Sequence, residues 1–126
     1  MGLCNPTLIK QYKAGGAISA NLIVKLSADD TIVAAAAATD SVLGVLGEID
    51  AESGDHVDVV LAGVAEVVYG GNVTRGALLT SDANGKAVAA APASGVNNRI
   101  LGVALESGVS GDIGSVLIAH SSMQGA

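Results

Sequence analysis

The sequence lacks phenylalanine and tryptophan, and its only aromatic residues are Tyr12 and Tyr69. Large rings normally supply much of the apolar area that a protein core buries. Here valine, leucine, isoleucine and alanine have to build the core of a 126-residue chain, which has the length of one domain. The shortage of large side chains predicts additional burial through oligomerisation or through docking onto a larger body.

Cysteine and long apolar runs are equally scarce. Cys4 is the only cysteine, so neither an intrachain disulfide nor a cage of thiolates around a metal can form. No apolar run approaches the roughly 18 residues that a membrane-spanning helix needs. The first residues do not form a signal peptide, because Pro6, Lys10 and Lys13 interrupt them. We expect a soluble protein without a membrane partner.

Basic residues are outnumbered, with six lysines and arginines against twelve acids and a net charge of −6. The segment from Met1 to Lys25 contains three lysines and no acid, whereas six carboxylates and no base lie between Asp40 and Asp58. General nucleic-acid binding requires a basic face that displaces counterions. This balance therefore argues against direct nucleic-acid binding and sets the basic N-terminus apart from an acidic body.

No motif for catalysis or metal binding emerges. The two histidines, His56 and His120, lie in no recognisable catalytic pattern, and no nucleophile elbow is present. The acidic residues between Asp50 and Asp58 could supply oxygen ligands for calcium, but they lack the spacing of a calcium loop, which favours a solvated turn. We predict no enzymatic activity, no catalytic residues, no cofactor and no metal.

One pattern occurs twice: a strand, a turn of serine, glycine and aspartate, and a second strand. This order is typical of a β-hairpin with a longer loop. Val42 aligns with Ile100 and Ser53 with Ser110, so the connecting segment is slightly shorter in the second copy. Two copies are too few for a stacked array, so they indicate two related hairpins in one sheet assembly. The copies are 42–48, 53–55 and 59–62, and 100–106, 110–112 and 116–119.

Further strands are predicted around these hairpins. Residues 22–26 and 31–33 flank a turn, and residues 77–80 and 86–89 flank an Asn-Gly turn, the strongest short hairpin signal. Residues 57–68 are predicted to form a long central strand that is apolar on both faces in its middle, with a bend or bulge at Gly63. Strands throughout predict an all-β fold, a small β-barrel or β-sandwich with an internal two-fold hairpin repeat.

The N-terminal residues show neither helical nor strand periodicity. We therefore predict an extended N-terminal arm over residues 1–20 that leaves the body at Gly15-Gly16, followed by a single β domain over residues 21–126. A disordered terminus is the alternative. The arm's apolar and basic side chains are the candidate partner-binding residues, expected to become ordered when a partner binds: Leu3, Leu8, Ile9, Lys10, Tyr12 and Lys13.

Several stretches together resemble the capsid decoration, or cement, proteins of tailed bacteriophages. The likeness covers roughly residues 20–120, rests on packing and turn patterns of glycine and aliphatic residues, and does not extend to the predicted arm. The stretches are 42–45, 59–65 with Val67-Val68, 76–82 with 85–88, and 100–106 before Ser110-Gly111-Asp112.

The resemblance implies a non-enzymatic virion protein, made in the host cytoplasm, that binds the outer surface of an assembled head. Such proteins bridge neighbouring major capsid subunits and stabilise the shell, often as trimers, so the expected partners are the major capsid protein and further copies of this chain. Two alternatives remain at this stage: another self-assembling virion subunit of the tail or shell, and a carbohydrate-binding β-module. The second is disfavoured because two tyrosines make a poor stacking platform.

Overall fold

The computed structural model describes residues 5–125, which contain nine β-strands and no helix, so no helix among them could cross a membrane. The all-β prediction is confirmed. The strands are β1 (Asn5–Ala14), β2 (Ile23–Ala28), β3 (Thr31–Ala34), β4 (Val42–Leu46), β5 (His56–Val68), β6 (Leu78–Ser81), β7 (Ala87–Ala89), β8 (Asn97–Ala104) and β9 (Ile113–Gln124).

The first five strands form a closed barrel, hereafter barrel 1. The order β1-β3-β2-β4-β5 returns to its start because β5 also pairs with β1, antiparallel, from Asn5 opposite Val64 to Lys13 opposite His56. Closure leaves these strands few unpaired edges. Alternate side chains point inward and form one core cluster, with Tyr12, Ile32 and Val59 among its members.

Strand β5 belongs to both halves of the molecule. Its first part pairs with β1 and β4, and its second part, from Gly63 to Val68, pairs with β9. Gly63 marks the change of partner, with a φ of 91° and backbone contacts so close that a Cβ would lie 2.6 Å from Thr7 N. Only glycine adopts this conformation and approach at low cost, so the predicted special position at Gly63 is confirmed.

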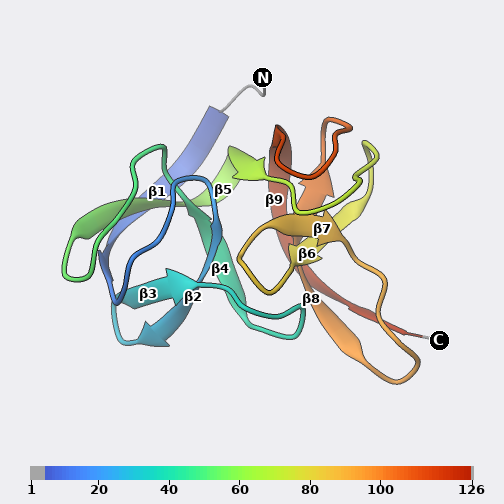
Figure 1. Cartoon of the computed structure of the whole chain (residues 1–126), viewed down its shortest axis with the longest axis horizontal. Coiled ribbons are helices and arrows are strands. Elements are labelled where there is room, and N and C mark those ends of the chain that lie inside the picture. Colours follow the sequence, from blue (N-terminus) through green and yellow to red (C-terminus); the bar gives the residue numbers. More distant parts are fainter. Residues whose placement is uncertain (1–4, 126) are drawn as a thin grey trace.

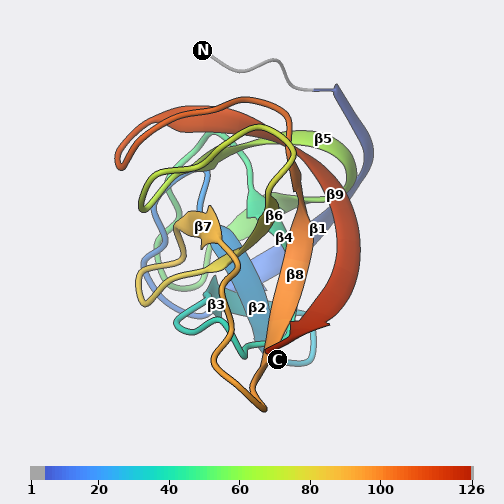
Figure 2. The same ribbon diagram turned by 90° about the vertical axis from the view of Figure 1, so that its right-hand side faces the viewer.

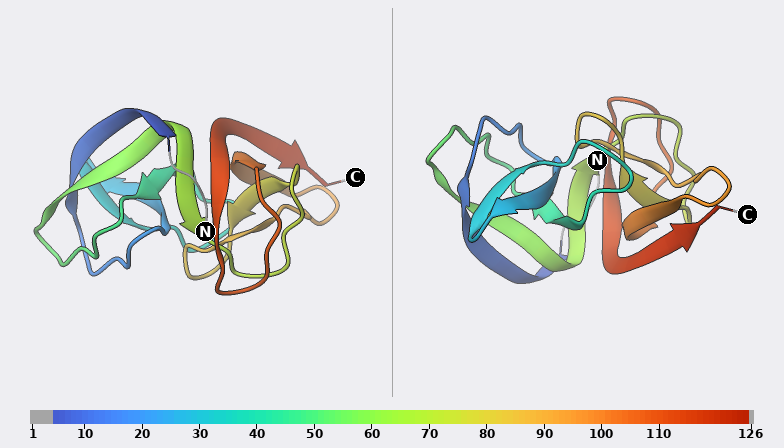
Figure 3. Two further views of the ribbon diagram at one scale, coloured as in Figure 1. Left: turned by 90° about the horizontal axis from the view of Figure 1, so that it is seen from above. Right: turned by 90° about the horizontal axis from the view of Figure 1, so that it is seen from below.

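The second part of β5 opens a second ring, hereafter barrel 2, in the order β5-β9-β8-β6-β7. A parallel bridge between Tyr69, just after β5, and Ala87 of β7 completes the circuit. The Tyr69 side chain is fully buried in the second core cluster, which also includes Ile23 and Val45 of barrel 1. Figures 1 and 3 show the two barrels side by side, with β5 leading from one into the other.

The two barrels repeat one another beyond the two hairpins seen in the sequence. The Gly15 amide donates to Ile32 O at 2.7 Å, and at the corresponding place in barrel 2 the Gly70 amide donates to Ala87 O at 2.8 Å. The Ile18–Ala51 bridge has its counterpart in the Val73–Gly108 bridge. The predicted internal hairpin repeat is therefore confirmed, and it is part of a repeat that includes all strands of both barrels.

Residues 5–14 differ from the predicted arm. They are extended, but they form β1 within barrel 1 and do not leave the body at Gly15-Gly16. The physical reason is that β1 covers the edge that β5 would otherwise expose, and it contributes Tyr12 and Ala14 to the core. Residues 1–4 lie outside the described residues. At the other end of the described residues, β9 continues to Gln124.

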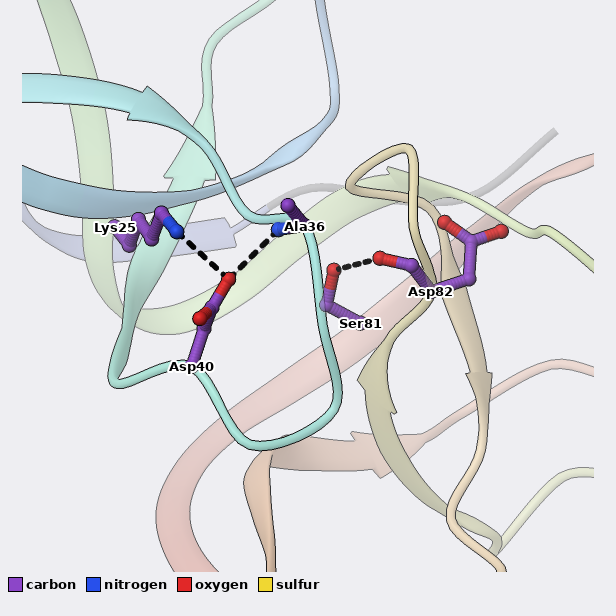
Figure 4. Close-up of polar contacts among 5 residues, drawn as sticks. All are labelled: Lys25, Ala36, Asp40, Ser81 and Asp82. Atoms are coloured by element: carbon purple, nitrogen blue, oxygen red, sulfur yellow. Dashed lines mark hydrogen bonds and ion pairs between the residues drawn. The ribbon is translucent and has the colours of Figure 1, made fainter.

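The loop between β3 and β4 joins the two barrels. Its Ala38 carbonyl accepts hydrogen bonds from the Arg99 amide at 2.7 Å and from Thr80 Oγ1 at 3.3 Å, both in barrel 2. Figure 4 shows how Asp40 holds this loop, through Lys25 Nζ at 2.9 Å and the Ala36 amide at 2.8 Å. The amide and the lysine keep the pKa of Asp40 below its ordinary value.

Candidate functional site

Strand β1 carries four of the six predicted partner-binding residues in exposed positions. Leu8 and Ile9 are 53% and 48% exposed, and Lys10 and Lys13 are exposed as well. Lys10 Nζ lies 3.4 Å from Asp30 Oδ1 and 4.1 Å from the centre of the Tyr12 ring. We call these four exposed residues, Leu8, Ile9, Lys10 and Lys13, the β1 surface. Lys10 lies on the same face of the strand as Tyr12, and Ile9 and Lys13 lie on the opposite face.

The remaining two predicted residues do not join this surface. Tyr12 is 9% exposed and packs in the core of barrel 1, where Val24 and Val59 are other members of the cluster. Its alternation with exposed Gln11 and Lys13 follows the period of two along a strand. Tyr12 therefore holds β1 in place, and only its ring face beneath Lys10 lies near the surface. Leu3 lies outside the described residues.

The acidic turn between β4 and β5 uses its carboxylates to order the backbone. Asp50 Oδ1 accepts a hydrogen bond from the Ala20 amide at 2.7 Å, and Asp55 Oδ2 accepts one from the Glu52 amide at 2.9 Å. Among residues 5–125, no group of three or more histidine, cysteine, aspartate and glutamate side chains is arranged to hold a metal. The geometry assigns these carboxylates to turn formation.

The two histidines lie apart. His56 is exposed at the start of β5, whereas His120 Nε2 is 2.8 Å from Leu43 O across the junction of the barrels. Neither ring contacts a serine, cysteine or carboxylate side chain in the hydrogen bonds of the described residues. The structure therefore assembles no nucleophile with a base and an orienting group among these residues.

Barrel 2 carries a row of two exposed and two half-buried apolar side chains that was not predicted from the sequence. Leu117 of β9 is 43% exposed and lies opposite Val64 of β5 and Val103 of β8. Leu78 of β6, also exposed, lies opposite Val103. We call these four residues, Leu78, Val103, Leu117 and Val64, the apolar row. The signal available in the sequence was the absence of any lysine, arginine, aspartate or glutamate after Asp112.

Charge is divided unequally between the two barrels. Residues 5–62 contain three lysines against eight carboxylates, a net charge of −5, whereas residues 63–125 contain three bases against four acids, a net charge of −1. Charged side chains are depleted in the centres of protein interfaces. Barrel 2, which carries the apolar row and fewer charged side chains, is therefore better suited to protein contact than the acidic turns of barrel 1.

Comparison with known proteins identifies a matching family and a protein of similar fold. Residues 7–119 match the family described as phage cement protein. The chain is also similar in structure to the head fiber gp8.5 N base of bacteriophage phi29, with a TM-score of 0.68, 21% sequence identity, and coverage of 93% of this chain and 98% of that chain. At this identity the likeness shows the shared fold alone. No curated protein matches the chain. The family match spans most of the sequence, and the chain therefore belongs to the phage cement protein family, as a structural protein associated with the bacteriophage capsid.

Proposed function

We propose that this protein is a capsid decoration protein. It binds the outer surface of an assembled phage head, bridges neighbouring major capsid subunits and stabilises the shell without catalysing a reaction. Family membership supports association with the capsid.

The observation that carries the proposal is the presence of two exposed contact surfaces on barrels that share one strand. The β1 surface lies on barrel 1 and the apolar row on barrel 2, and β5 runs without interruption through both. Hydrogen bonds between the barrels, such as Ile23 N to Gly85 O at 2.8 Å, reinforce the connection. A bridging protein has to transmit force between two contacts, and a shared strand does so without a flexible linker.

The β1 surface is proposed to contact the major capsid protein. Leu8 and Ile9 offer apolar area that is removed from water on contact, at about 25 cal/mol per Å². Lys10 and Lys13 would pair with carboxylates of the shell, and such exposed pairs contribute about 0–1 kcal/mol each. Apolar contact is therefore expected to supply most of the affinity, and the lysines to add salt dependence.

The apolar row is proposed to join copies of this chain into a trimer. Val64, Val103 and Leu117 lie side by side on three neighbouring strands, with Leu117 exposed and the two valines half-buried. Adjacent apolar side chains at the surface favour an interaction site. Each copy presents one such row. Self-association through it would also supply the burial that a core poor in aromatic rings lacks.

The test is the addition of purified protein to heads assembled from the major capsid protein alone. We expect saturable binding in co-sedimentation, density on the outer surface in cryo-electron microscopy, and a higher temperature of head disruption in light scattering. Binding without any gain in thermal stability would remove the bridging role. No binding at saturating protein would overturn the proposed function.

A further inference from the structure

The last part of β9 has an unpaired edge. Residues 113–118 of β9 pair with β5, and residues 116–118 pair with β8 as well, but β5 bends away at Gly63. Residues 119–124 keep only the β8 side, where Ser122 lies opposite Arg99 and Gln124 opposite Asn97. No other residue in the described part of the chain pairs with their second edge. Figure 2 shows β9 along the margin of barrel 2.

The direction of the backbone groups on this edge follows from one hydrogen bond. The Arg99 amide donates to Ala38 O at 2.7 Å, on the side of β8 that faces away from β9. In an antiparallel ladder, residues that lie opposite each other alternate between hydrogen-bonded pairs and pairs whose N–H and C=O groups point away from each other. Arg99 and Ser122 form a pair of the second kind. Ser122, opposite Arg99, therefore directs its N–H and C=O to the unpaired edge. The alternation of the strand places Gln124 in the same orientation.

A shallow groove runs beside this edge, where β9 and β8 approach β4. Its volume is about 260 Å³, and it is lined by Val42, Leu43, Arg99, Ile100 and His120. Three of these side chains are apolar and two are basic or titratable, and no carboxylate lines the groove. No ion pair involves Arg99 among residues 5–125, in a protein whose net charge is −6. The groove therefore offers apolar walls and a cation without a counterion.

We propose that β9 residues 119–124 accept an extended acidic segment of a partner protein as an additional β-strand. The partner's backbone would pair with Ser122 and Gln124, an apolar side chain of the segment would enter the groove, and a carboxylate would pair with Arg99. Strand addition takes its affinity from main-chain hydrogen bonds and its specificity from alternate side chains. An arginine–carboxylate contact adds geometric selection. The proposal rests on the proposed function in one respect, that the natural segment belongs to the shell.

The decisive variant is Ser122→Pro, with Ser122→Ala as its matched control. Proline removes the N–H that points to the unpaired edge and leaves the β8 ladder intact, the one orientation in which an edge strand tolerates it. Alanine removes the hydroxyl and keeps the N–H. Circular dichroism and thermal unfolding establish that both variants are folded. Arg99→Gln, which removes the charge and keeps a polar side chain, tests the charge separately.

The first probe is an acetylated eight-residue peptide of alternating valine and glutamate, titrated into ¹⁵N-labelled protein. We expect chemical-shift changes at the amides of residues 119–124, loss of these changes in Ser122→Pro, and wild-type behaviour in Ser122→Ala. Arg99→Gln should weaken peptide binding about fivefold or more. Changes confined to another face, or no change at millimolar peptide, would overturn the inference.

The second probe is the assembled head, which separates this inference from the proposed function. If heads bind the wild type and Ser122→Ala but bind Ser122→Pro at least tenfold more weakly, the segment belongs to the shell. Equal binding of all three variants overturns the edge as a site for the shell while decoration itself stands. If heads fail to bind but the peptide perturbs residues 119–124, the proposed function fails and the edge site stands. Concentration-dependent dimers that Ser122→Pro abolishes would make a second copy the occupant and overturn the acidic partner.

Discussion

At the scale of single residues, Gly63 has the closest backbone contacts of the glycines with positive φ in residues 5–125. Its φ of 91° disfavours any side chain, and a Cβ would lie 2.6 Å from Thr7 N and 2.7 Å from Asn5 O. We expect Gly63→Ala to lower the free energy of unfolding by roughly 3 kcal/mol, because clash adds to the strain of about 1–2 kcal/mol for a left-handed residue.

Gly111→Ala is the matched control for Gly63→Ala. Gly111 has a φ of 92°, but a Cβ there would meet nothing within 4 Å. Only the conformational strain of about 1–2 kcal/mol should then appear. Urea unfolding of both variants measures the difference. Equal losses would show that the close passage of β1 over Gly63 does not constrain the strand.

Asp40 is the residue through which pH should act on the junction of the barrels. The Ala36 amide, and then Lys25, hold its pKa below the ordinary value in the folded state. Its carboxylate therefore stabilises the fold above a pH of about 4, the unfolded value, and that contribution is lost as the pH falls through the folded pKa. We expect Asp40→Asn to lower the free energy of unfolding by about 1 kcal/mol at pH 7.

The difference between wild type and Asp40→Asn should shrink as the pH falls below about 4, where both side chains become uncharged. Urea unfolding at pH 7, 5 and 3 provides the measurement. Asp29→Asn is the control, because Asp29 is exposed and its carboxylate takes part in no hydrogen bond or ion pair among the described residues. A difference that is constant across this pH range would contradict the assigned role of the Asp40 charge.

At the scale of elements, the two faces of β1 have different roles, one in the core and one at the surface. Tyr12 is buried in barrel 1, so Tyr12→Ala should lower the free energy of unfolding by about 3 kcal/mol. Ile9 is half exposed, so Ile9→Asp should change stability by less than about 1 kcal/mol and weaken head binding about tenfold. Chemical unfolding and co-sedimentation with heads separate these effects. Full head binding by folded Ile9→Asp would exclude the β1 surface as a capsid contact.

At the scale of the whole molecule, the distribution of apolar surface predicts the oligomer. Light scattering should give about three times the chain mass of 12.2 kDa, and Leu117→Asp, in the centre of the apolar row, should give the mass of one chain. Ile49→Asp is the control, because Ile49 is 79% exposed in the loop after β4 and lies outside the row. A trimer that persists in Leu117→Asp would place the interface elsewhere.

The sequence by itself determined the all-β class, the two related hairpins and the special backbone at Gly63. Each of these depends on local chemistry: the alternation of side chains along a strand, the turn residues, and the conformational freedom of glycine. The second turn of the repeat illustrates this, since Asp112 Oδ2 accepts the Val109 amide at 3.0 Å as Asp55 accepts that of Glu52. A hydrogen bond between residues three apart can be predicted from the order of residues in the turn.

Tertiary structure alone decided the place of β1 and the full extent of the repeat. β1 pairs with β5, which is distant in the sequence, and its short inward face of Tyr12 and Ala14 left too little alternation for recognition. The equivalent of Ala14 in barrel 2 is Tyr69, whose ring occupies the space that Gly114 leaves open. The equivalence is carried by backbone hydrogen bonds, which do not depend on side-chain identity, and so no sequence pattern records it.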